Sequence, residues 1–534
     1  MKKIVVALVI LMMTVGLAFG GGGTQAPTLT STNVVTVEVF DRGSDGGRSL
    51  AHNNAWTNWI KAQVKKDLGI DVTFQPVGRW SENTDIVNLM TSISAPDLCY
   101  TYNVPMVNNF RDLGGLMDLS PYIDKYLPDM KKLLGADTSV PGQDLIYRDR
   151  MPDGKIFSVP NYVVNPPQTN IFMRKDWLDK LGLAVPKTTK EFHDALVAFR
   201  TRVTELPGNV TAARVVPFGV NSDARWGFRP IIYAFFDPKL SEKDLWIYNV
   251  TDRPISIPGF KDGVRLINQW YNENLIYRDF PLMTVADDFY NQIKSGVVGA
   301  FAQNWDFPYR TDNNIAVELA RNVPGATYIP VDCIQAPDGV NRKYISEKAG
   351  LRIFIPTYSK NQEAALKYLN WLCKKENYTY LQIGEAGRNH TLVNGVPQSQ
   401  ARPAGDPWFM NSSNNIDYTM PMNGIEMGSA DLNARVVALS YPGTPADTIV
   451  SAYNTSIARG RAFPVVTGVR TTKDGQFGAT LMDKADALLA QSIRASTAQF
   501  ESVWDAGYRD WLSSGGQEVI DERRAVYPAT PARR

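Results

Sequence analysis

Residues 34–40 read VVTVEVF, and they begin the pattern that decides the fold class. The valines alternate with polar residues, which is the period of a strand with one buried face. Residues 56–68 then carry apolar side chains at helical spacing, and Gly69 is placed to end that helix. Apolar residues alternate again from 70 to 74. A strand, a helix and a strand in this order indicate a βαβ unit, so the sequence predicts an α/β fold.

The alternation of strands and helices continues along the chain. Thr188 and Glu191 stand at capping-box spacing before another helical stripe. Residues 479–527 are predicted to be helical, with a break at 513–516. We expect further strands at residues 98–102, 171–173, 297–301 and 351–356, and further helices at residues 83–94, 175–181, 263–271 and 361–374.

Length and composition limit the possible classes of protein. The chain has 534 residues, more than one ordinary domain holds, so we expect at least two lobes. Hydrophobic residues make up 44% and charged residues 21%, which excludes a disordered chain. The 56 Lys and Arg residues nearly balance the 54 Asp and Glu residues, so no net charge attracts the protein to nucleic acid.

The N-terminus carries the pattern of an export signal. Two lysines precede an uncharged, mostly apolar run at 4–15, and residues 18–20 supply a cleavage site for signal peptidase. We therefore predict a signal peptide at residues 1–20 and a flexible leader at residues 21–32. An uncleaved anchor helix is the alternative.

The sequence lacks the common motifs for catalysis and for cofactor or metal binding. It contains no dinucleotide fingerprint, phosphate-binding loop, nucleophile elbow or HExxH zinc motif. Cys99 and Cys373 lie in apolar surroundings, so we interpret them as buried thiols rather than ligands. We assign no catalytic residue, metal site or cofactor. A catalytic triad or a carboxylate pair assembled by the fold stays open, because only separation in space would identify it.

Aromatic residues beside amides or arginine suggest a binding surface. Sugars present apolar faces and a rim of hydroxyl groups, and a flat ring next to an amide or guanidinium suits both. Packing in a core is the alternative for each of these residues. The candidate ligand-binding residues are Tyr102, Asn103, Tyr162, Arg225, Trp226, Asn304, Trp305 and Trp408. We assign the tryptophans on helical stripes to the core, namely Trp56, Trp59, Trp177, Trp270 and Trp371.

One stretch is similar to a known signature. Residues 172–183 read FMRKDWLDKLGL and continue through PKT at 186–188 to AFR at 198–200. This stretch closely resembles family 1 extracellular solute-binding proteins, the LplA/LipO-type lipoproteins related to alginate-binding proteins. Supporting matches are APD at 95–97, GLMDL at 115–119, DGKI at 153–156, GAF at 299–301 and IGEAG at 383–387.

The resemblance implies a two-lobed α/β fold of the type II periplasmic-binding-protein kind, with hinge strands, discontinuous lobes and a helical C-terminus. We place the N-terminal lobe at 33–164 plus about 335–395, and the C-terminal lobe at 165–334 plus about 396–534. The crossings would fall near residues 162–168 and 327–340. By its position, Trp305 matches an aromatic residue that lines the sugar cleft in relatives.

Two departures from the family pattern bear on location and metal binding. Residues 17–21 read LAFGG and lack the lipobox cysteine, which favours a free periplasmic or secreted protein over a lipoprotein. The segment 204–216, where some relatives carry a calcium loop, has Glu205 as its one carboxylate, so we expect no calcium there.

These observations lead to one functional prediction. We expect the substrate-binding component of an ABC importer, a monomer and not an enzyme, that captures an oligosaccharide or other carbohydrate by hinge closure and delivers it to inner-membrane permease subunits. A peptide-binding importer component and, less favoured, a secreted glycan-degrading enzyme are the alternatives.

Overall fold

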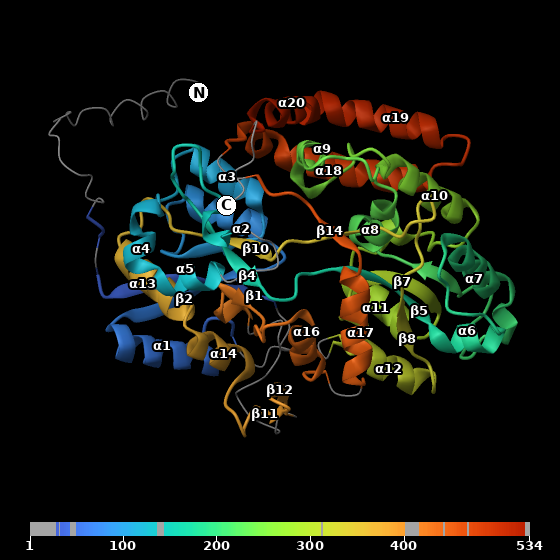
Figure 1. The fold of residues 1–534 in the computed structure, drawn as a ribbon, viewed down its shortest axis with the longest axis horizontal. Helices are drawn as coiled ribbons and strands as arrows, with labels where there is room; N and C mark the ends of the chain where they lie inside the picture. The colour runs from blue at the N-terminus through green and yellow to red at the C-terminus, as the bar shows by residue number, and fades with distance from the viewer. Residues whose placement is uncertain are drawn as a thin grey trace, which may run out of the picture.

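The computed structural model describes residues 28–30, 32–42, 50–135, 144–310, 313–400, 416–441, 444–466 and 469–528. The predicted signal peptide lies outside these residues, as does most of the predicted leader. Two groups of helices and strands lie side by side, and three C-terminal helices run along the top of the molecule (Figure 1).

The helices and strands have the following bounds. The strands are β1 Val34–Asp41, β2 Asp71–Gly78, β3 Cys99–Thr101, β4 Val159–Val163, β5 Thr169–Arg174, β6 Val216–Gly219, β7 Val298–Asn304, β8 Tyr328–Val331, β9 Lys343–Ile345, β10 Ala349–Phe354, β11 His390–Val393, β12 Val396–Ser399, β13 Met422–Asn423 and β14 Gly460–Ala462. The helices are α1 Ala55–Leu68, α2 Glu82–Thr91, α3 Val104–Asp112, α4 Ile123–Tyr126, α5 Pro128–Leu134, α6 Lys175–Leu181, α7 Thr189–Thr201, α8 Ala224–Ala234, α9 Glu242–Tyr248, α10 Phe260–Asn272, α11 Ala286–Lys294, α12 Ile315–Asn322, α13 Gln362–Leu372, α14 Lys375–Ile383, α16 Ala430–Ala438, α17 Ala446–Ile457, α18 Thr472–Arg494, α19 Phe500–Trp511 and α20 Gln517–Val526. Single 3-10 turns connect several of these elements.

The first lobe begins with the βαβ unit that the sequence predicts. β1 and β2 pair in parallel, and α1 connects them. Asn54 caps α1 by accepting a hydrogen bond from the backbone of Thr57, and Gly69 closes it at a φ of 70°, which glycine adopts without strain. A four-stranded sheet in the order β13-β4-β10-β3 completes the lobe.

The second lobe is built on a four-stranded sheet in the order β6-β7-β5-β8. Thr188 caps α7 by accepting from the backbone of Glu191, as its spacing predicts. The carboxylate of Glu191, however, accepts from the backbone of Lys187, so the reciprocal half of the capping box is not formed. The predicted break in the C-terminal helices is a π turn at Leu512–Gly516, where Gly515 has a φ of 113°.

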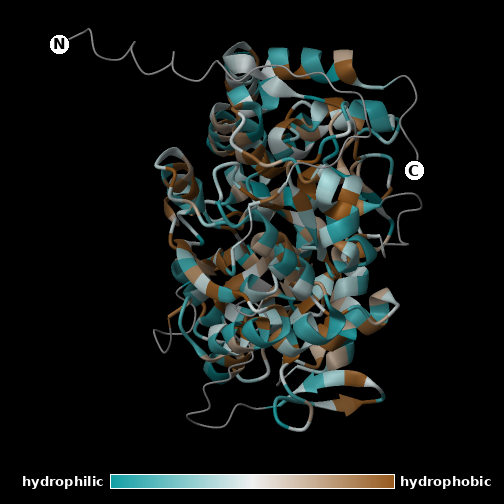
Figure 2. Ribbon diagram, turned by 90° about the vertical axis from the view of Figure 1, so that its left-hand side faces the viewer, coloured by the Kyte–Doolittle hydropathy of each residue, from teal (hydrophilic) through white to brown (hydrophobic). Residues whose placement is uncertain are grey.

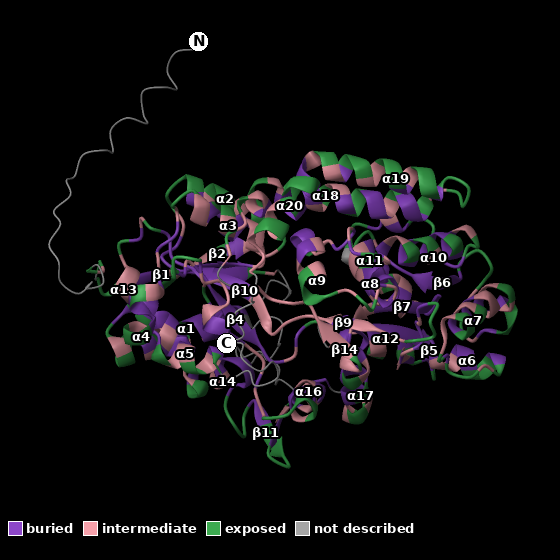
Figure 3. Ribbon diagram, turned by 45° about the horizontal axis from the view of Figure 1, so that its top comes forward, coloured by how far each residue is buried: buried purple, intermediate pink, exposed green. Residues whose placement is uncertain are grey.

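Both lobes bury their strands under amphipathic helices. Hydrophilic and hydrophobic residues alternate along the helices in Figure 2, and Figure 3 shows buried strands beneath helices whose outer faces are exposed. Trp56, Trp177, Trp270 and Trp371 are almost fully buried, which confirms their assignment to the core. Trp59 is partly buried and packs against the same core.

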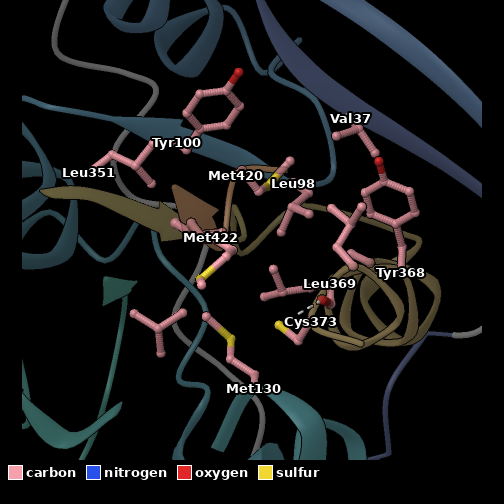
Figure 4. Close-up of a cluster of buried hydrophobic side chains, with 14 of the residues drawn as sticks. Val37, Leu98, Tyr100, Met130, Leu351, Tyr368, Leu369, Cys373, Met420 and Met422 are labelled. Atoms are coloured by element: carbon pink, nitrogen blue, oxygen red, sulfur yellow. Dashed lines mark hydrogen bonds between the residues drawn. The ribbon is translucent and has the colours of Figure 1, made fainter. Parts of the chain in front are cut away.

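The core of the first lobe includes a segment from late in the sequence. Met420 and Met422 pack with Val37, Leu98 and other residues of this core (Figure 4). We expected everything from about residue 396 onward to belong to the second lobe, and this packing does not match that division. The cause is β13, which pairs in parallel with β4 of the first lobe.

The chain passes between the lobes three times, and two of these crossings lie next to each other; the third follows β13, where the chain leaves the first lobe for α17 in the core of the second. The first lies between β4 and β5, as expected, and the second lies between β9 and β10 at residues 346–348. The second is later than the expected 327–340, because Tyr344 of β9 still packs in the core of the second lobe. Gln168 donates to the carbonyl of Ser346 at 3.3 Å, and the Ser346 hydroxyl donates to the carbonyl of Pro167 at 3.1 Å. These two crossings therefore form one hydrogen-bonded hinge.

Candidate functional site

A cavity of about 1130 Å³ lies between the lobes. Its walls come from the start of α3 in the first lobe, the start of α8 and the end of β7 in the second lobe, and the two adjacent crossings. The segment that leads into α18 also contributes, including Phe463 and Thr471. A cavity of this size exceeds the range usual for single small molecules, so it has room for a ligand of several rings.

The structure brings together most of the predicted binding residues. The residues that line the cavity are Tyr102, Asn103, Arg225, Trp226, Asn304 and Trp305. Tyr162 does not line it, because its side chain is buried in β4 and its hydroxyl interacts with Glu426 at 2.9 Å and with the Lys348 ammonium at 3.1 Å. Trp408 lies outside the described residues.

Trp226 presents a positioned indole at the start of α8. Asp223 caps this helix and accepts from the backbone of Trp226. The indole Nε1 donates to Gln303 Oε1 at 2.6 Å, which fixes the ring on the sheet. The guanidinium groups of Arg225 and Arg229 lie 6.0 and 5.0 Å from the ring centroid, within cation–π range.

Trp305 offers less surface than its position in the sequence suggests. The residue is 3% exposed, and its ring packs edge-to-face on Tyr453 at a centroid distance of 4.9 Å. Trp305 is one of the lining residues, but it packs in the core of the second lobe. Trp226 is half-buried and is the more accessible of the two.

Three asparagines carry buried acceptor atoms at the cavity. The Oδ1 atoms of Asn165, Asn249 and Asn304 are buried and have no hydrogen-bond partner among the described residues. All three residues line the cavity. An unpaired buried carbonyl is costly, and a hydroxyl donor from a ligand would satisfy it. Asn304 was predicted from the tryptophan that follows it, whereas Asn165 was missed because no aromatic residue or arginine is adjacent to it in the sequence.

The side chain of Asn103 is hydrogen-bonded within the protein, although the residue lines the cavity. Its Oδ1 caps α3 by accepting from Met106 at 3.0 Å, and its amide donates to Asn83 at 2.9 Å. Both groups are thus engaged within the protein. The neighbouring Tyr102 ring is covered by the Arg79 guanidinium at 4.4 Å. Burial raises the pKa of Tyr102, so the phenol is neutral at physiological pH.

The charged lining consists of arginines and carboxylates. Of the residues that the structure describes, eleven arginines and eight carboxylates face the cavity, and no lysine does. The arginines are Arg42, Arg79, Arg111, Arg148, Arg150, Arg225, Arg229, Arg253, Arg310, Arg352 and Arg523. Their positions range from 42 to 523, so no local sequence pattern could have revealed that they converge.

Most of these charges are paired within the protein. Arg148 contacts Glu347 at 2.6 Å and Asp149 at 2.9 Å, and Arg352 contacts Asp149 at 2.5 Å. Burial alone would raise the pKa of Asp149, but attraction to Arg352 and Arg148 outweighs it, and the pKa is lowered. This carboxylate therefore stays ionised and is a poor candidate for a general acid.

The described residues offer no metal centre. They contain no group of three or more His, Cys, Asp or Glu side chains close enough to hold an ion. The three cysteines are buried free thiols. Burial raises the pKa of Cys99 and Cys373 well above the usual value, so neither thiol is a reactive thiolate.

Two lobes on a hydrogen-bonded hinge, with a polar cavity between them, define a ligand-binding protein that can close around its ligand. A family model described as bacterial extracellular solute-binding protein matches residues 50–379, more than half of the chain. The chain belongs to this family, which confirms the resemblance seen in the sequence. An extracytoplasmic location follows from membership of an extracellular family. Within the described residues, every helix is too short or too polar to cross a bilayer.

Known proteins resemble the chain over much of its length. The fructooligosaccharide ABC transporter substrate-binding protein FusA of Streptococcus pneumoniae is 23% identical over 384 residues, covering 64% of this chain and 65% of FusA. The polygalacturonan/rhamnogalacturonan-binding protein YtcQ of Bacillus subtilis is 21% identical over 510 residues, covering 91% of this chain and 88% of YtcQ. The crystal structure of alginate-binding protein AlgQ2 without calcium superposes with a TM-score of 0.65 at 17% identity, covering 94% and 99% of the two chains. This likeness confirms the predicted two-lobed fold.

Proposed function

We propose that the protein is the substrate-binding component of an ABC importer and that it captures an oligosaccharide in the cavity between its lobes. Relatives that bind fructooligosaccharide and polygalacturonan support a carbohydrate ligand. The observation that carries the proposal is the combination, in one cavity, of a partly exposed Trp226 with the unpaired acceptor atoms of Asn165, Asn249 and Asn304. A sugar ring supplies an apolar face for the indole and hydroxyl donors for the amides.

The protein would bind the ligand and release it chemically unchanged. Ligand held by one lobe favours closure only to the extent that the second lobe adds contacts in the closed state. We propose that the lobes turn about the crossings that meet at Ser346. The permease would recognise the closed form, and the binding protein would act as a monomer.

The two alternatives make different demands on the cavity. A glycan-degrading enzyme needs an available acid and base, but six of the eight lining carboxylates form ion pairs with arginines. A peptide-binding component would place backbone-matching groups along an extended chain rather than a ring beside amide acceptors. Both arguments favour carbohydrate capture.

Export completes the proposal. We propose that residues 1–20 are cleaved as a signal peptide and that the mature protein is free in the periplasm or secreted. The basis is the export pattern of the N-terminus and the lack of cysteine in the segment LAFGG at 17–21. Edman sequencing of protein recovered from the periplasmic fraction would read a new N-terminus near residue 21.

The ligand class can be tested by thermal shift and intrinsic fluorescence. The purified protein is titrated with fructo-oligosaccharides, maltooligosaccharides, oligogalacturonates and a set of tetrapeptides, and a ligand raises the melting temperature once it exceeds its Kd. Trp226→Ala should weaken the best glycan by about 10- to 150-fold, the equivalent of about 1.5–3 kcal/mol for one buried aromatic contact.

Trp80→Ala is the matched control. Trp80 is 80% exposed and does not line the cavity, so its loss should leave the Kd unchanged. Tetrapeptides that bind while every glycan fails, or chemical conversion of a bound glycan during the titration, would refute carbohydrate capture.

A further inference from the structure

We propose that the ligand of this cavity is an anionic glycan, one that carries a carboxylate or a sulfate ester, and that Arg225 and Arg229 bind its negative charge. This inference rests on the proposed carbohydrate function and adds the charge of the ligand. It comes from asking which of the arginines at the cavity are already neutralised by the protein.

Eight of the eleven lining arginines form an ion pair with a carboxylate. Their partners are Asp417, Glu82, Asp112, Asp149, Glu347, Asp486, Asp306 and Asp474. Arg150, Arg225 and Arg229 have no carboxylate oxygen within 4 Å among the described residues. Two lining carboxylates, Asp252 and Asp483, also have no ion pair within the part of the chain that the structure describes, which leaves one positive charge in excess among these lining residues.

Two of the three unpaired arginines lie together on one helix. Arg225 and Arg229 are four residues apart in the first two turns of α8, so they occupy the same face of the helix. The ring of Trp226 lies within 6.0 Å of both guanidinium groups. Two guanidinium groups beside one indole form a compact site, in which a sugar ring and its charged substituent can be bound together.

Arg229 is the more buried of the two. The residue is 9% exposed, and its Nη2 donates to the Ser346 hydroxyl at 3.2 Å and to the Tyr344 carbonyl at 3.5 Å. These neutral oxygens satisfy donors but supply no negative charge. A buried charge is costly until it is paired, so an incoming anion gains more here than at an exposed arginine.

Arg225 keeps all of its guanidinium donors available. It forms no hydrogen bond or ion pair with any described residue, and its guanidinium lies 6.0 Å from the centroid of the Trp226 ring. Asp223, Asp252 and Asp486 attract it from beyond 4 Å. Nε and Nη2 of Arg253 donate to the two carboxylate oxygens of Asp486, at 2.8 and 3.1 Å, so Asp486 is not free to pair with Arg225. The planar fork of Arg225 matches the two oxygens of a carboxylate or sulfate.

Isothermal titration with chemically matched ligands tests the proposal. Oligogalacturonate is compared with the same oligosaccharide after its carboxyl groups have been reduced to alcohols, and a sulfated galactan oligosaccharide is compared with its desulfated form. In wild-type protein, one charged member should bind at least about 30-fold more tightly than its neutral counterpart, and added salt should reduce the difference. The pair that shows the preference identifies carboxylate or sulfate as the charged group.

Variants then locate the charge preference. Arg225→Gln should weaken binding of the charged glycan by about 10- to 100-fold and change binding of the neutral form by less than about 3-fold, whereas Arg225→Lys should retain part of the preference. Arg229→Gln should act in the same direction. The matched control is Arg111→Gln, which also removes one positive charge from the lining, while its partner Asp112 keeps the ion pair with Arg470 at 3.1 Å.

The outcomes separate the two proposals. Equal binding of charged and neutral partners in both pairs would overturn the anionic ligand and leave carbohydrate capture standing. An equal loss for Arg225→Gln and Arg111→Gln would overturn the assignment to α8. Failure of every glycan, charged or neutral, would overturn the proposed function itself.

Discussion

Replacing Arg174 with methionine tests how much a buried ion pair contributes to the second lobe. Arg174 has a side chain with no exposed surface, at the end of β5. It donates to both carboxylate oxygens of Asp176, at 2.8 and 2.7 Å, and to the carbonyl of Gly296 at 2.7 Å. Its guanidinium also lies 4.8 Å from the ring of Trp177. Methionine replaces the aliphatic part of the side chain but leaves the carboxylate of Asp176 and the carbonyl of Gly296 without their donor.

The expected loss of stability is large. Removing one partner of a buried ion pair costs about 3–5 kcal/mol. For a domain of roughly 150–250 residues each kcal/mol corresponds to about 2–4 °C, so the melting temperature should fall by roughly 6–20 °C. Differential scanning calorimetry measures the change. The double variant Arg174→Met with Asp176→Leu should recover much of the loss, because it removes the abandoned charge as well.

An exposed pair of the same geometry is the control. Arg202 donates to both carboxylate oxygens of Glu205 at 2.8 and 2.7 Å, but both side chains are more than 40% exposed. Arg202→Met should change the melting temperature little, because exposed pairs are screened by water. Equal shifts for the two single variants would refute the argument that burial makes the Arg174 pair strong.

Two further predictions concern the contact between the lobes and a buried acid. A Cβ atom at Gly478 of α18 would lie 3.1 Å from Cβ of Pro105 in α3, so Gly478→Leu should push the lobes apart. Small-angle X-ray scattering should then show a larger radius of gyration for Gly478→Leu but not for the control Gln476→Leu, whose side chain is exposed. An unchanged radius for Gly478→Leu would contradict this contact. Burial raises the pKa of Glu38 well above its usual 4.5. Above about pH 4.5 the unfolded chain therefore loses this proton while the folded protein keeps it, and the free energy of unfolding falls as the pH rises. The melting temperature of the wild-type protein should therefore fall between about pH 5 and pH 8, and Glu38→Gln should make this fall smaller. An unchanged dependence of the melting temperature on pH in the variant would mean that other groups cause the fall.

Local pattern was sufficient for most strands and helices of this fold. The βαβ unit at the start of the chain, the helix of α6 and the capping of α7 depend on residues close in sequence, and all are present. The second crossing was misplaced because β9 pairs with β14, more than a hundred residues later, and that pairing keeps β9 in the second lobe. The segment around Met422 was misassigned for the same reason, since its partner β4 precedes it by about 260 residues.

The candidate site was predictable only where a local signal existed. Trp226 and Asn304 were found because an aromatic residue stands beside a polar one in the sequence. The same signal selected Tyr162, whose hydroxyl instead serves the packing of β4 against Glu426 and Lys348. Among the arginines of the lining only Arg225, beside Trp226, had such a signal; the other ten had none, because composition counts charges and does not say which of them are paired.

The ion pairing of the arginines, rather than their number, also determines where an anionic ligand would bind. Eleven arginines at a cavity would suggest a strongly positive site, yet carboxylates neutralise eight of them, and two of the remaining three, Arg225 and Arg229, lie on α8 beside the hinge. Arg229 donates to Ser346, and Ser346 donates across to Pro167 of the other crossing. An anion bound by Arg229 would therefore contact a side chain that is hydrogen-bonded to Ser346, the residue that joins the two crossings. A ligand promotes closure only through interactions that differ between the open and closed states. A charge placed at the hinge can supply such a difference, whereas one placed at the distant rim of a single lobe cannot.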